Sequence, residues 1–142
     1  MTGSDYQSFD GAKLALFCGD SILVYKRDQR EDIPYPGLLD LPGGGREGSE
    51  SPQSCVLREL NEEFSLVLSP EQLSKGQLYT IEFNGLPGYF FTANLAPAEQ
   101  TKIRLGEEGQ YWQFMPVTDF IRRADAISHL QQMVEAYWLQ QQ

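Results

Sequence analysis

Three glutamates in one short stretch are the residues of this chain whose types and spacing best suit chemistry. Glu59, Glu62 and Glu63 lie at helical spacing, which places their carboxylates within about a third of a helix circumference. No lysine lies four residues away, and like charges at this spacing destabilise a bare helix by roughly a few tenths of a kcal/mol per pair. A divalent cation such as Mg²⁺, which favours carboxylate and phosphate oxygens, would reverse that cost. The alternative interpretation is an acidic helix face in solvent.

Local signals predict the elements that hold these glutamates. Ser51 suits an N-cap, Pro52 suits the first helical position, and the apolar spacing predicts a helix that ends near Phe64. A short apolar run, residues 38–41, and three glycines, residues 43–45, come before this helix. Glycines permit positive φ and the close approach of a ligand to the backbone, although a glycine cluster alone indicates only a turn. We therefore expect a strand, a glycine loop and a helix that carries three carboxylates.

The rest of the chain alternates between strand and helix patterns. We expect strands at residues 13–18, 21–26, 77–83, 89–95 and 111–115, a loop at residues 28–38, and a second helix at residues 126–139. Gly19 and Asp20 predict the turn of a hairpin between the first two strands, and residues 84–88 predict another turn. This order predicts an α/β or α+β layered fold. Residues 1–11 are expected to be a loose lead-in, and residues 12–142 a single domain.

Composition excludes several classes of function. The chain has 11 Lys and Arg against 20 Asp and Glu, a net charge of −9, which does not suit binding to a nucleic-acid polymer but allows a small phosphorylated ligand with a metal ion. Cys18, Cys55 and His129 cannot form a four-ligand Cys/His zinc site. His129 lies in the second helix pattern, which argues against a His-based triad. No apolar run is long enough to cross a membrane, and two cysteines without a secretory signal predict free thiols in the cytoplasm.

The stretch from residue 43 to residue 66 resembles the Nudix box of the Nudix (MutT-like) hydrolases. That signature is Gly, five residues, Glu, seven residues, Arg-Glu, an aliphatic residue, any residue, Glu-Glu, any residue, Gly and an aliphatic residue. The matching residues are Gly44, Glu50, Arg58, Glu59, Leu60, Glu62, Glu63 and Leu66. Ser65 replaces the second Gly of the signature. Gly there would ease a left-handed helix cap, so the change concerns at most about 1 kcal/mol of local stability and not the metal ligands.

The resemblance implies a Nudix fold, in which a mixed β-sheet is sandwiched between helices (α/β/α), and a cytoplasmic enzyme. It implies hydrolysis of a pyrophosphate bond in a nucleoside diphosphate-linked substrate with Mg²⁺ or Mn²⁺. Glu59, Glu62, Glu63 and the carbonyl of Gly43 are the implied metal ligands. Glu50 and Arg58 are the implied ion pair that fixes the glycine-rich segment, including Gly44, to the helix. The resemblance further implies a small nucleotide-type substrate, no membrane or nucleic-acid polymer as partner, and homodimers as an option.

The general base and the substrate contacts are less fixed by this resemblance. The base is a glutamate of the box in some members and a loop glutamate before a late strand in others, which favours Glu108, with Glu107 as its rival. Arg27 ends a strand pattern where similar members contact substrate phosphate; the alternative is a solvated charge. Tyr35, Phe83 and Tyr89 could stack on a base, although aromatic residues near loops often serve packing.

Several functions remain open at this point. We expect a (deoxy)nucleoside triphosphate as substrate, giving a monophosphate and pyrophosphate. Nucleoside diphosphate conjugates, such as ADP-ribose or dinucleoside polyphosphates, are the alternative substrates. A nucleotide-sensing Nudix domain without activity would not need the complete set of glutamates, and a purely structural acidic module would not bind Mg²⁺.

Overall fold

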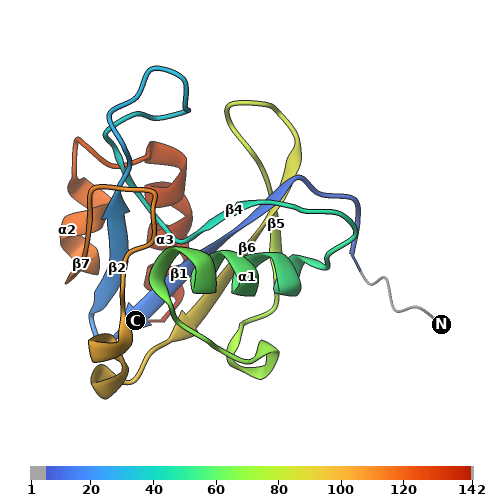
Figure 1. Cartoon of the computed structure of the whole chain (residues 1–142). Coiled ribbons are helices and arrows are strands. Elements are labelled where there is room, and N and C mark those ends of the chain that lie inside the picture. The colour runs from blue at the N-terminus through green and yellow to red at the C-terminus, as the bar shows by residue number, and fades with distance from the viewer. Residues whose placement is uncertain (1–5, 142) are drawn as a thin grey trace.

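The computed structural model describes residues 6–141, in which a mixed β-sheet forms the middle layer (Figure 1). The strands in this range are β1 (Gly11–Cys18), β2 (Ser21–Lys26), β3 (Leu39–Asp40), β4 (Gly43–Gly45), β5 (Gln77–Thr80), β6 (Pro87–Asn94) and β7 (Tyr111–Pro116). The helices are α1 (Pro52–Phe64), α2 (Val117–Arg122) and α3 (Ser128–Gln140), with 3₁₀ turns η1 (Pro70–Gln72) and η2 (Pro97–Lys102). No helix of residues 6–141 has the length and apolar character needed to cross a membrane.

Strand β1 lies at the centre of the sheet and has partners on both sides. It runs parallel to β6 along its length, while its last residues pair antiparallel with β2 and its first residues pair antiparallel with β4. Strands β3 and β7 pair antiparallel with β2, and β5 pairs antiparallel with β6. Strand β4 lies beside the start of β1. Helix α1 follows β4 in the chain and therefore begins at the same end of the sheet.

Alternation along β1 builds one hydrophobic core on each face of the sheet. Leu14 and Leu16 are fully buried on the face that α1 covers, in the cluster that contains Leu60. Ala15 and Phe17 point to the opposite face, into the cluster that contains Leu130 of α3 and residues of α2. Full burial of one such Leu or Phe side chain stabilises the fold by about 1.5–3 kcal/mol. Helices thus cover both faces of a mixed sheet, which confirms the predicted α/β/α arrangement.

Helix α1 begins and ends where its sequence predicts. The Ser51 Oγ accepts a hydrogen bond from the Ser54 N–H at 3.1 Å, and Pro52 occupies the first turn, where a missing N–H costs nothing. At the other end, Ser65 adopts the left-handed conformation with φ 59° and donates its N–H to the Asn61 carbonyl. Ser65 therefore occupies the backbone conformation that Gly adopts most easily, and the helix ends as it would with Gly.

The prediction of a glycine loop at residues 43–45 was wrong, because these residues form β4. They pair with Gly11, Ala12 and Lys13 at the start of β1. A Cβ at Gly43, where φ is 139°, would lie 2.1 Å from the Ala12 carbonyl oxygen. The glycines thus allow a close approach between two strands, a long-range contact that the local pattern did not indicate.

Other boundaries moved by a few residues. Strand β1 begins at Gly11, and Phe9 before it is buried, so the loose lead-in predicted for residues 1–11 is not loose there, while residues 1–5 lie outside the described residues. The strand predicted at residues 77–83 ends at Thr80, because residues 81–86 form the turn to β6. The strand expected in the apolar run before the glycines is confirmed as β3, which is only two residues long, whereas α2, six residues long, was not predicted.

Candidate active site

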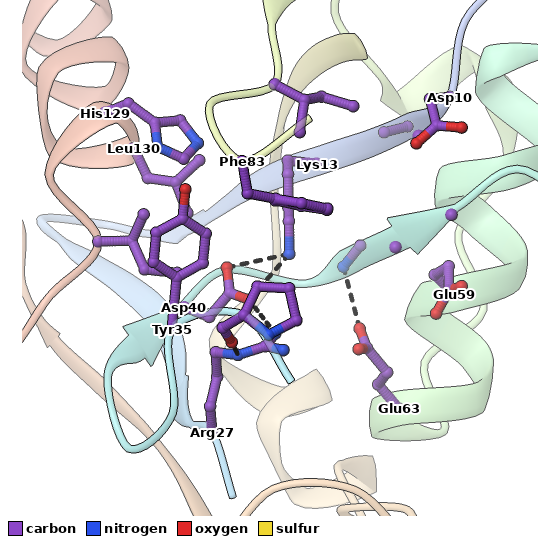
Figure 2. A pocket seen from close by; sticks show the side chains of 18 of the residues that line it. Asp10, Lys13, Arg27, Tyr35, Asp40, Glu59, Glu63, Phe83, His129 and Leu130 are labelled. Atoms are coloured by element: carbon purple, nitrogen blue, oxygen red, sulfur yellow. Dashed lines mark hydrogen bonds and ion pairs between the residues drawn. The ribbon is translucent and has the colours of Figure 1, made fainter. Parts of the chain in front are cut away.

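A cavity of about 380 Å³ lies at the end of the sheet where β1, β4, α1 and α3 meet (Figure 2). Its charged lining residues are Asp10, Lys13, Arg27, Asp40, Glu59, Glu63 and Glu108, and its aromatic lining residues are Tyr25, Tyr35, Tyr79, Phe83 and His129. Figure 2 shows Glu59 and Glu63 at one side, Tyr35 and His129 at the opposite side, and Lys13, Asp40 and Arg27 between them. The cavity therefore has a carboxylate end and an aromatic end.

The carboxylate end is built from one turn of α1 and the backbone of β4. Glu59 and Glu63 lie four residues apart, on one face of the helix, and both line the cavity. The Gly43 N–H donates a hydrogen bond to Glu63 Oε1 at 2.9 Å. A Cβ at Gly44 would lie 2.5 Å from Glu59 Oε2, so Gly is required for this carboxylate to rest against the strand. The box glycines and glutamates thus form one packed unit.

The electrostatic environment of this end suits a cation. Burial raises the pKa of Glu63 to about 8, and the neighbouring charges of Glu59 and Asp40 add to the shift, against Lys13 and the Gly43 N–H. Burial also raises the pKa of Glu59, with Arg58 opposing. Buried carboxylates of this kind gain from a positive partner, and carboxylate and carbonyl oxygens are the ligands that hard divalent cations prefer. The residues present therefore fit a divalent cation.

Glu62, the third glutamate of the stripe, is turned away from the cavity. Its side chain is 55% exposed, and its Oε1 accepts a hydrogen bond from Arg58 Nη1 at 2.9 Å. Across residues 6–141, no group of three or more His, Cys, Asp or Glu side chains is arranged to hold a metal ion. The structure thus brings together Glu59, Glu63 and Gly43 of the four predicted ligands, and leaves Glu62 on Arg58.

Arg58 lies outside the cavity lining and ties the segment after β4 to α1. Its Nε donates to Glu50 Oε2 at 2.7 Å, and its Nη2 donates to Glu50 Oε1 at 3.0 Å and to the Gly45 carbonyl at 2.8 Å. Nη1 also contacts Glu59 Oε2 at 3.2 Å. These hydrogen bonds raise the pKa of Arg58 and lower the pKa of Glu50. Two hydrogen bonds between one guanidinium and one carboxylate fix the orientation of both groups, in addition to the attraction between their charges.

A buried carboxylate beside two cations forms the middle of the cavity, and sequence reasoning missed it. Asp40, which is 1% exposed, accepts hydrogen bonds from Lys13 Nζ at 3.0 and 2.9 Å and from Arg27 Nη1 at 2.9 Å. The Tyr25 hydroxyl and the Leu41 N–H also donate to it, at 3.2 and 2.7 Å. Burial by itself raises the pKa of Asp40, but Lys13 and Arg27 together outweigh it and lower that pKa. The signal was present, since Lys13 and Asp40 each interrupt an apolar run.

The aromatic end brings together rings from three separate segments. Tyr35 contacts Phe83 edge to face at 6.2 Å between ring centroids, and His129 stacks on Tyr79 at 6.0 Å. The Tyr35 hydroxyl donates to Glu82 Oε1 at 2.8 Å, which links the segment before β3 to the turn after β5. Tyr35 also has a positive φ of 53°, a conformation rare for an aromatic residue. The predicted ligand-facing residues Tyr35 and Phe83 therefore both line the cavity.

Two other residues named from the sequence lie elsewhere. Tyr89 does not line the cavity: it is 8% exposed and packs edge to face on Phe9 at 5.6 Å. Glu107 is exposed and outside the cavity lining, whereas its neighbour Glu108 lines the cavity. The loop that carries them is held against α1 by the Gly106 N–H, which donates to the Glu63 carbonyl at 2.8 Å. Of the two rivals, only Glu108 is placed to reach a ligand in the cavity.

Cys55 packs beneath the glycine strand and faces no solvent. Its Sγ lies 3.7 Å from the Gly44 carbonyl oxygen and 3.6 Å from that of Gly45. Burial, with the charge of Glu50, raises the pKa of Cys55 to about 12. Cys18 and Cys55 are both free thiols, and Cys18 is only partly buried. Neither cysteine lines the cavity.

Comparison with known proteins gives a family and a fold. A family model described as NUDIX domain matches residues 10–137. No curated protein matches the chain. A MutT/nudix family protein from Enterococcus faecalis has a similar structure, and the chain spans about half of its length, 47%, at 20% identity and a TM-score of 0.64.

Three further solved structures are similar over nearly their whole length. The MutT protein from Methanosarcina mazei Go1 has a TM-score of 0.78 at 14% identity, with 97% of this chain and 98% of that chain covered. The NUDIX domain of Shewanella oneidensis NrtR, complexed with ADP ribose, has a TM-score of 0.73 at 19% identity, with 100% and 94% covered. A C. elegans Ap4A hydrolase, in a binary complex, has a TM-score of 0.71 at 20% identity, with 91% and 96% covered. At these identities the likeness concerns the fold.

Proposed function

This chain belongs to the Nudix family of pyrophosphohydrolases, and we propose that it cleaves a pyrophosphate bond of a (deoxy)nucleoside triphosphate to give a monophosphate and pyrophosphate. One observation carries the proposal: a single cavity joins the Glu59 and Glu63 carboxylates, packed on the Gly43–Gly45 backbone, to a group of aromatic rings. A divalent metal, which the family generally uses, supplies charge neutralisation and an activated water when bound. We propose Mg²⁺, or Mn²⁺ in its place.

Different residues along the cavity are proposed to bind the metal, the phosphate and the base. Glu59 and Glu63, with the Gly43 carbonyl, are proposed to hold the metal, and Glu62 joins them once its carboxylate leaves Arg58. Arg27, which lies between the two ends of the cavity, is proposed to contact a substrate phosphate. Tyr35 and Phe83 are proposed to stack on the base.

The proton of the attacking water needs an acceptor at the carboxylate end. We propose Glu108, because it lines the cavity and its loop is fastened to α1 beside Glu63. A glutamate of the box is the rival, and Glu63 is the candidate among them because it lines the same cavity. The pH profile of kcat in Glu108→Gln separates the two, since loss of the base removes the acidic limb of that profile.

Nucleoside diphosphate conjugates are the second class of substrate. The observations that favour them are the Ap4A hydrolase and the ADP-ribose complex among the similar structures. Product identity separates the classes: a triphosphate yields pyrophosphate, whereas a conjugate yields two phosphorylated fragments. A non-catalytic nucleotide sensor is the remaining alternative, and it predicts nucleotide binding without any phosphate product.

A substrate panel tests the proposal directly. The full chain, with Mg²⁺ or Mn²⁺, is assayed on nucleoside triphosphates, ADP-ribose and dinucleoside polyphosphates, with products resolved by anion exchange. Glu59→Gln and Glu63→Gln are expected to lower turnover at least about a hundredfold, and Glu135→Gln, an exposed acid on α3, is the matched control. Wild-type turnover that both box variants retain would overturn the assignment of the carboxylates, and binding without turnover would favour the sensor.

The proposal also covers the number of domains, the oligomeric state and the cellular location of the protein. We propose that residues 12–142 act as one domain, that the chain forms homodimers, and that it works in the cytoplasm on small nucleotides without a nucleic-acid polymer or a membrane as partner. Light scattering at several protein concentrations tests the dimer, because a constant monomer mass would contradict it.

A further inference from the structure

The charged residues that line the cavity are mostly acidic, although the proposed substrate is an anion. Among residues 6–141 the lining has two cationic side chains, Lys13 and Arg27, against five carboxylates. A lining of one predominant sign attracts the opposite sign and repels its own. Apart from any bound metal, the attraction for a phosphate therefore depends on these two cations, and on how much of their charge the neighbouring carboxylates cancel.

Asp40 lies against both cations and is not itself placed to touch a ligand. Its side chain is 1% exposed, and its two oxygens accept hydrogen bonds from Lys13, Arg27, the Tyr25 hydroxyl and the Leu41 N–H. These bonds fix the carboxylate, and through it the side chains beside it (Figure 2). The negative charge of Asp40 must therefore cancel part of the charge of Lys13, of Arg27 or of both.

The hydrogen bonds of the two cations show which of them Asp40 takes up. Lys13 Nζ lies 3.0 and 2.9 Å from the two Asp40 oxygens and 3.3 Å from the Leu41 carbonyl oxygen, which uses all three donors of an ammonium. Arg27 donates from Nε to the Pro34 carbonyl at 2.8 Å and from Nη1 to Asp40 Oδ2 at 2.9 Å.

Arg27 thus keeps donors that Lys13 does not. A guanidinium has five N–H groups, and those of Arg27 beyond the two already used have no hydrogen-bond partner among residues 6–141. The Arg27 side chain lines the cavity and is 19% exposed. Lys13 is therefore committed to Asp40, whereas Arg27 is held by Asp40 and by the Pro34 carbonyl with part of its guanidinium left for a ligand.

We propose that Lys13 is a positioning residue for the phosphate contact of Arg27: its ammonium cancels the charge of Asp40, so that Asp40 fixes the guanidinium without neutralising it. The inference rests on the proposed function in that Arg27 is taken as the phosphate contact. With Lys13 in place, Lys13, Asp40 and Arg27 together carry one positive charge. Without Lys13 they carry none, and a buried carboxylate next to Arg27 repels the phosphate that Arg27 attracts.

A charge-removal pair of variants tests this role. Lys13→Gln removes the charge and keeps an amide N–H for Asp40, and KM for the best nucleotide of the panel is expected to rise about tenfold while kcat stays within about twofold. Adding Asp40→Asn restores one net positive charge, and its amide oxygen still accepts from Arg27, so KM is expected to return to within about threefold of wild type. A direct contact between Lys13 and the phosphate would give no such recovery. Lys102→Gln, at an exposed lysine paired with Glu99, is the matched control.

Binding of inorganic tripolyphosphate keeps this test separate from the proposed function. Isothermal titration calorimetry with Mg²⁺ measures its Kd for wild type, Lys13→Gln, the double variant and Lys102→Gln, at a temperature where thermal unfolding shows all four to be folded. Weaker binding by Lys13→Gln, with recovery in the double variant, supports the inference even if the wild type hydrolyses no nucleotide. Absence of binding by the wild type, equal affinity of wild type and Lys13→Gln, or a double variant as weak as Lys13→Gln would overturn it.

Discussion

Asp40→Asn is the substitution whose effect on stability follows most directly from the structure. The change keeps the size of the side chain and its contact with the Leu41 N–H, but it removes the negative charge between Lys13 and Arg27. Two cations are then left beside a neutral amide at a site that is 1% exposed. Removal of one partner from a buried ion pair typically costs about 3–5 kcal/mol, because the remaining charge is uncompensated.

The partial exposure of the two cations places the expected loss of unfolding free energy at the lower end of that range. The side chains of Lys13 and Arg27 are 17% and 19% exposed, so water screens part of the unpaired charge. We expect a loss of about 3 kcal/mol in the free energy of unfolding. For a chain of this size, each kcal/mol shifts Tm by about 2–4 °C, so Tm should fall by about 6–12 °C.

Urea denaturation, followed by tryptophan fluorescence, measures this loss against a matched control. Asp32→Asn breaks the Arg30–Asp32 pair, whose side chains are 59% and 64% exposed, and should leave the stability nearly unchanged because water screens the pair. Asp40→Asn together with Lys13→Gln should recover part of the loss, because one unpaired cation is then removed as well. Equal stability of Asp40→Asn and Asp32→Asn would refute the reasoning.

The pH dependence of the unfolding free energy, measured for wild type and Asp40→Asn, gives an independent check. The pKa of Asp40 is lowered in the folded state, so its stabilising effect is complete above the ordinary Asp pKa of about 3.9 and is lost as the pH falls below it. The difference in unfolding free energy between wild type and Asp40→Asn should therefore shrink as the pH falls below the ordinary Asp pKa. A difference that grows in acid would contradict the assigned sign.

Three further predictions concern the box. Ser65→Gly should raise the unfolding free energy by about 0.5–1 kcal/mol, because Gly adopts φ near 59° without steric cost; a loss in urea denaturation would show that the Ser65 hydroxyl contributes. Arg58→Gln should cost about 2–3 kcal/mol by leaving Glu50 and the Gly45 carbonyl without their donor, and Arg122→Gln, at an exposed position of α2, should cost under about 0.5 kcal/mol in the same assay. Mg²⁺ at about a hundred times its Kd should stabilise wild type by about 2.7 kcal/mol and Glu63→Gln by far less, and equal shifts in Tm for both proteins would contradict the proposed metal ligands.

The parts of the fold that could be predicted from the sequence are the parts that local chemistry determines. Ser51 and Pro52 fix the start of α1 because capping depends on neighbours only a few residues away. The alternation of β1 and β2 is likewise visible along the chain. Strand β4 was not predicted, because its pairing with Gly11 depends on a contact across more than thirty residues and its glycines carry no side-chain pattern.

The candidate site divides in the same way. The spacing of Glu59 and Glu63 on one helix placed both in the cavity, since helix geometry is local. Asp40 and Lys13 are 27 residues apart, and only the sheet brings them together. His129 was set aside because its helix pattern looked apolar, yet its position at the start of α3 directs it into the cavity. Asp40, Lys13 and His129, whose positions in the cavity depend on other elements, were therefore missed.

Cys55 gives this protein a chemical reporter of its own opening. Thiol reagents react with the thiolate, and Cys55, fully buried and with its pKa raised to about 12, offers almost none while β4 lies on α1. Its labelling rate therefore measures how often the glycine strand lifts from the helix, whereas the partly buried Cys18 follows the opposite end of β1. Protection of Cys55 by a nucleotide, at an unchanged rate for Cys18, would locate the ligand-induced tightening within a single strand–helix contact.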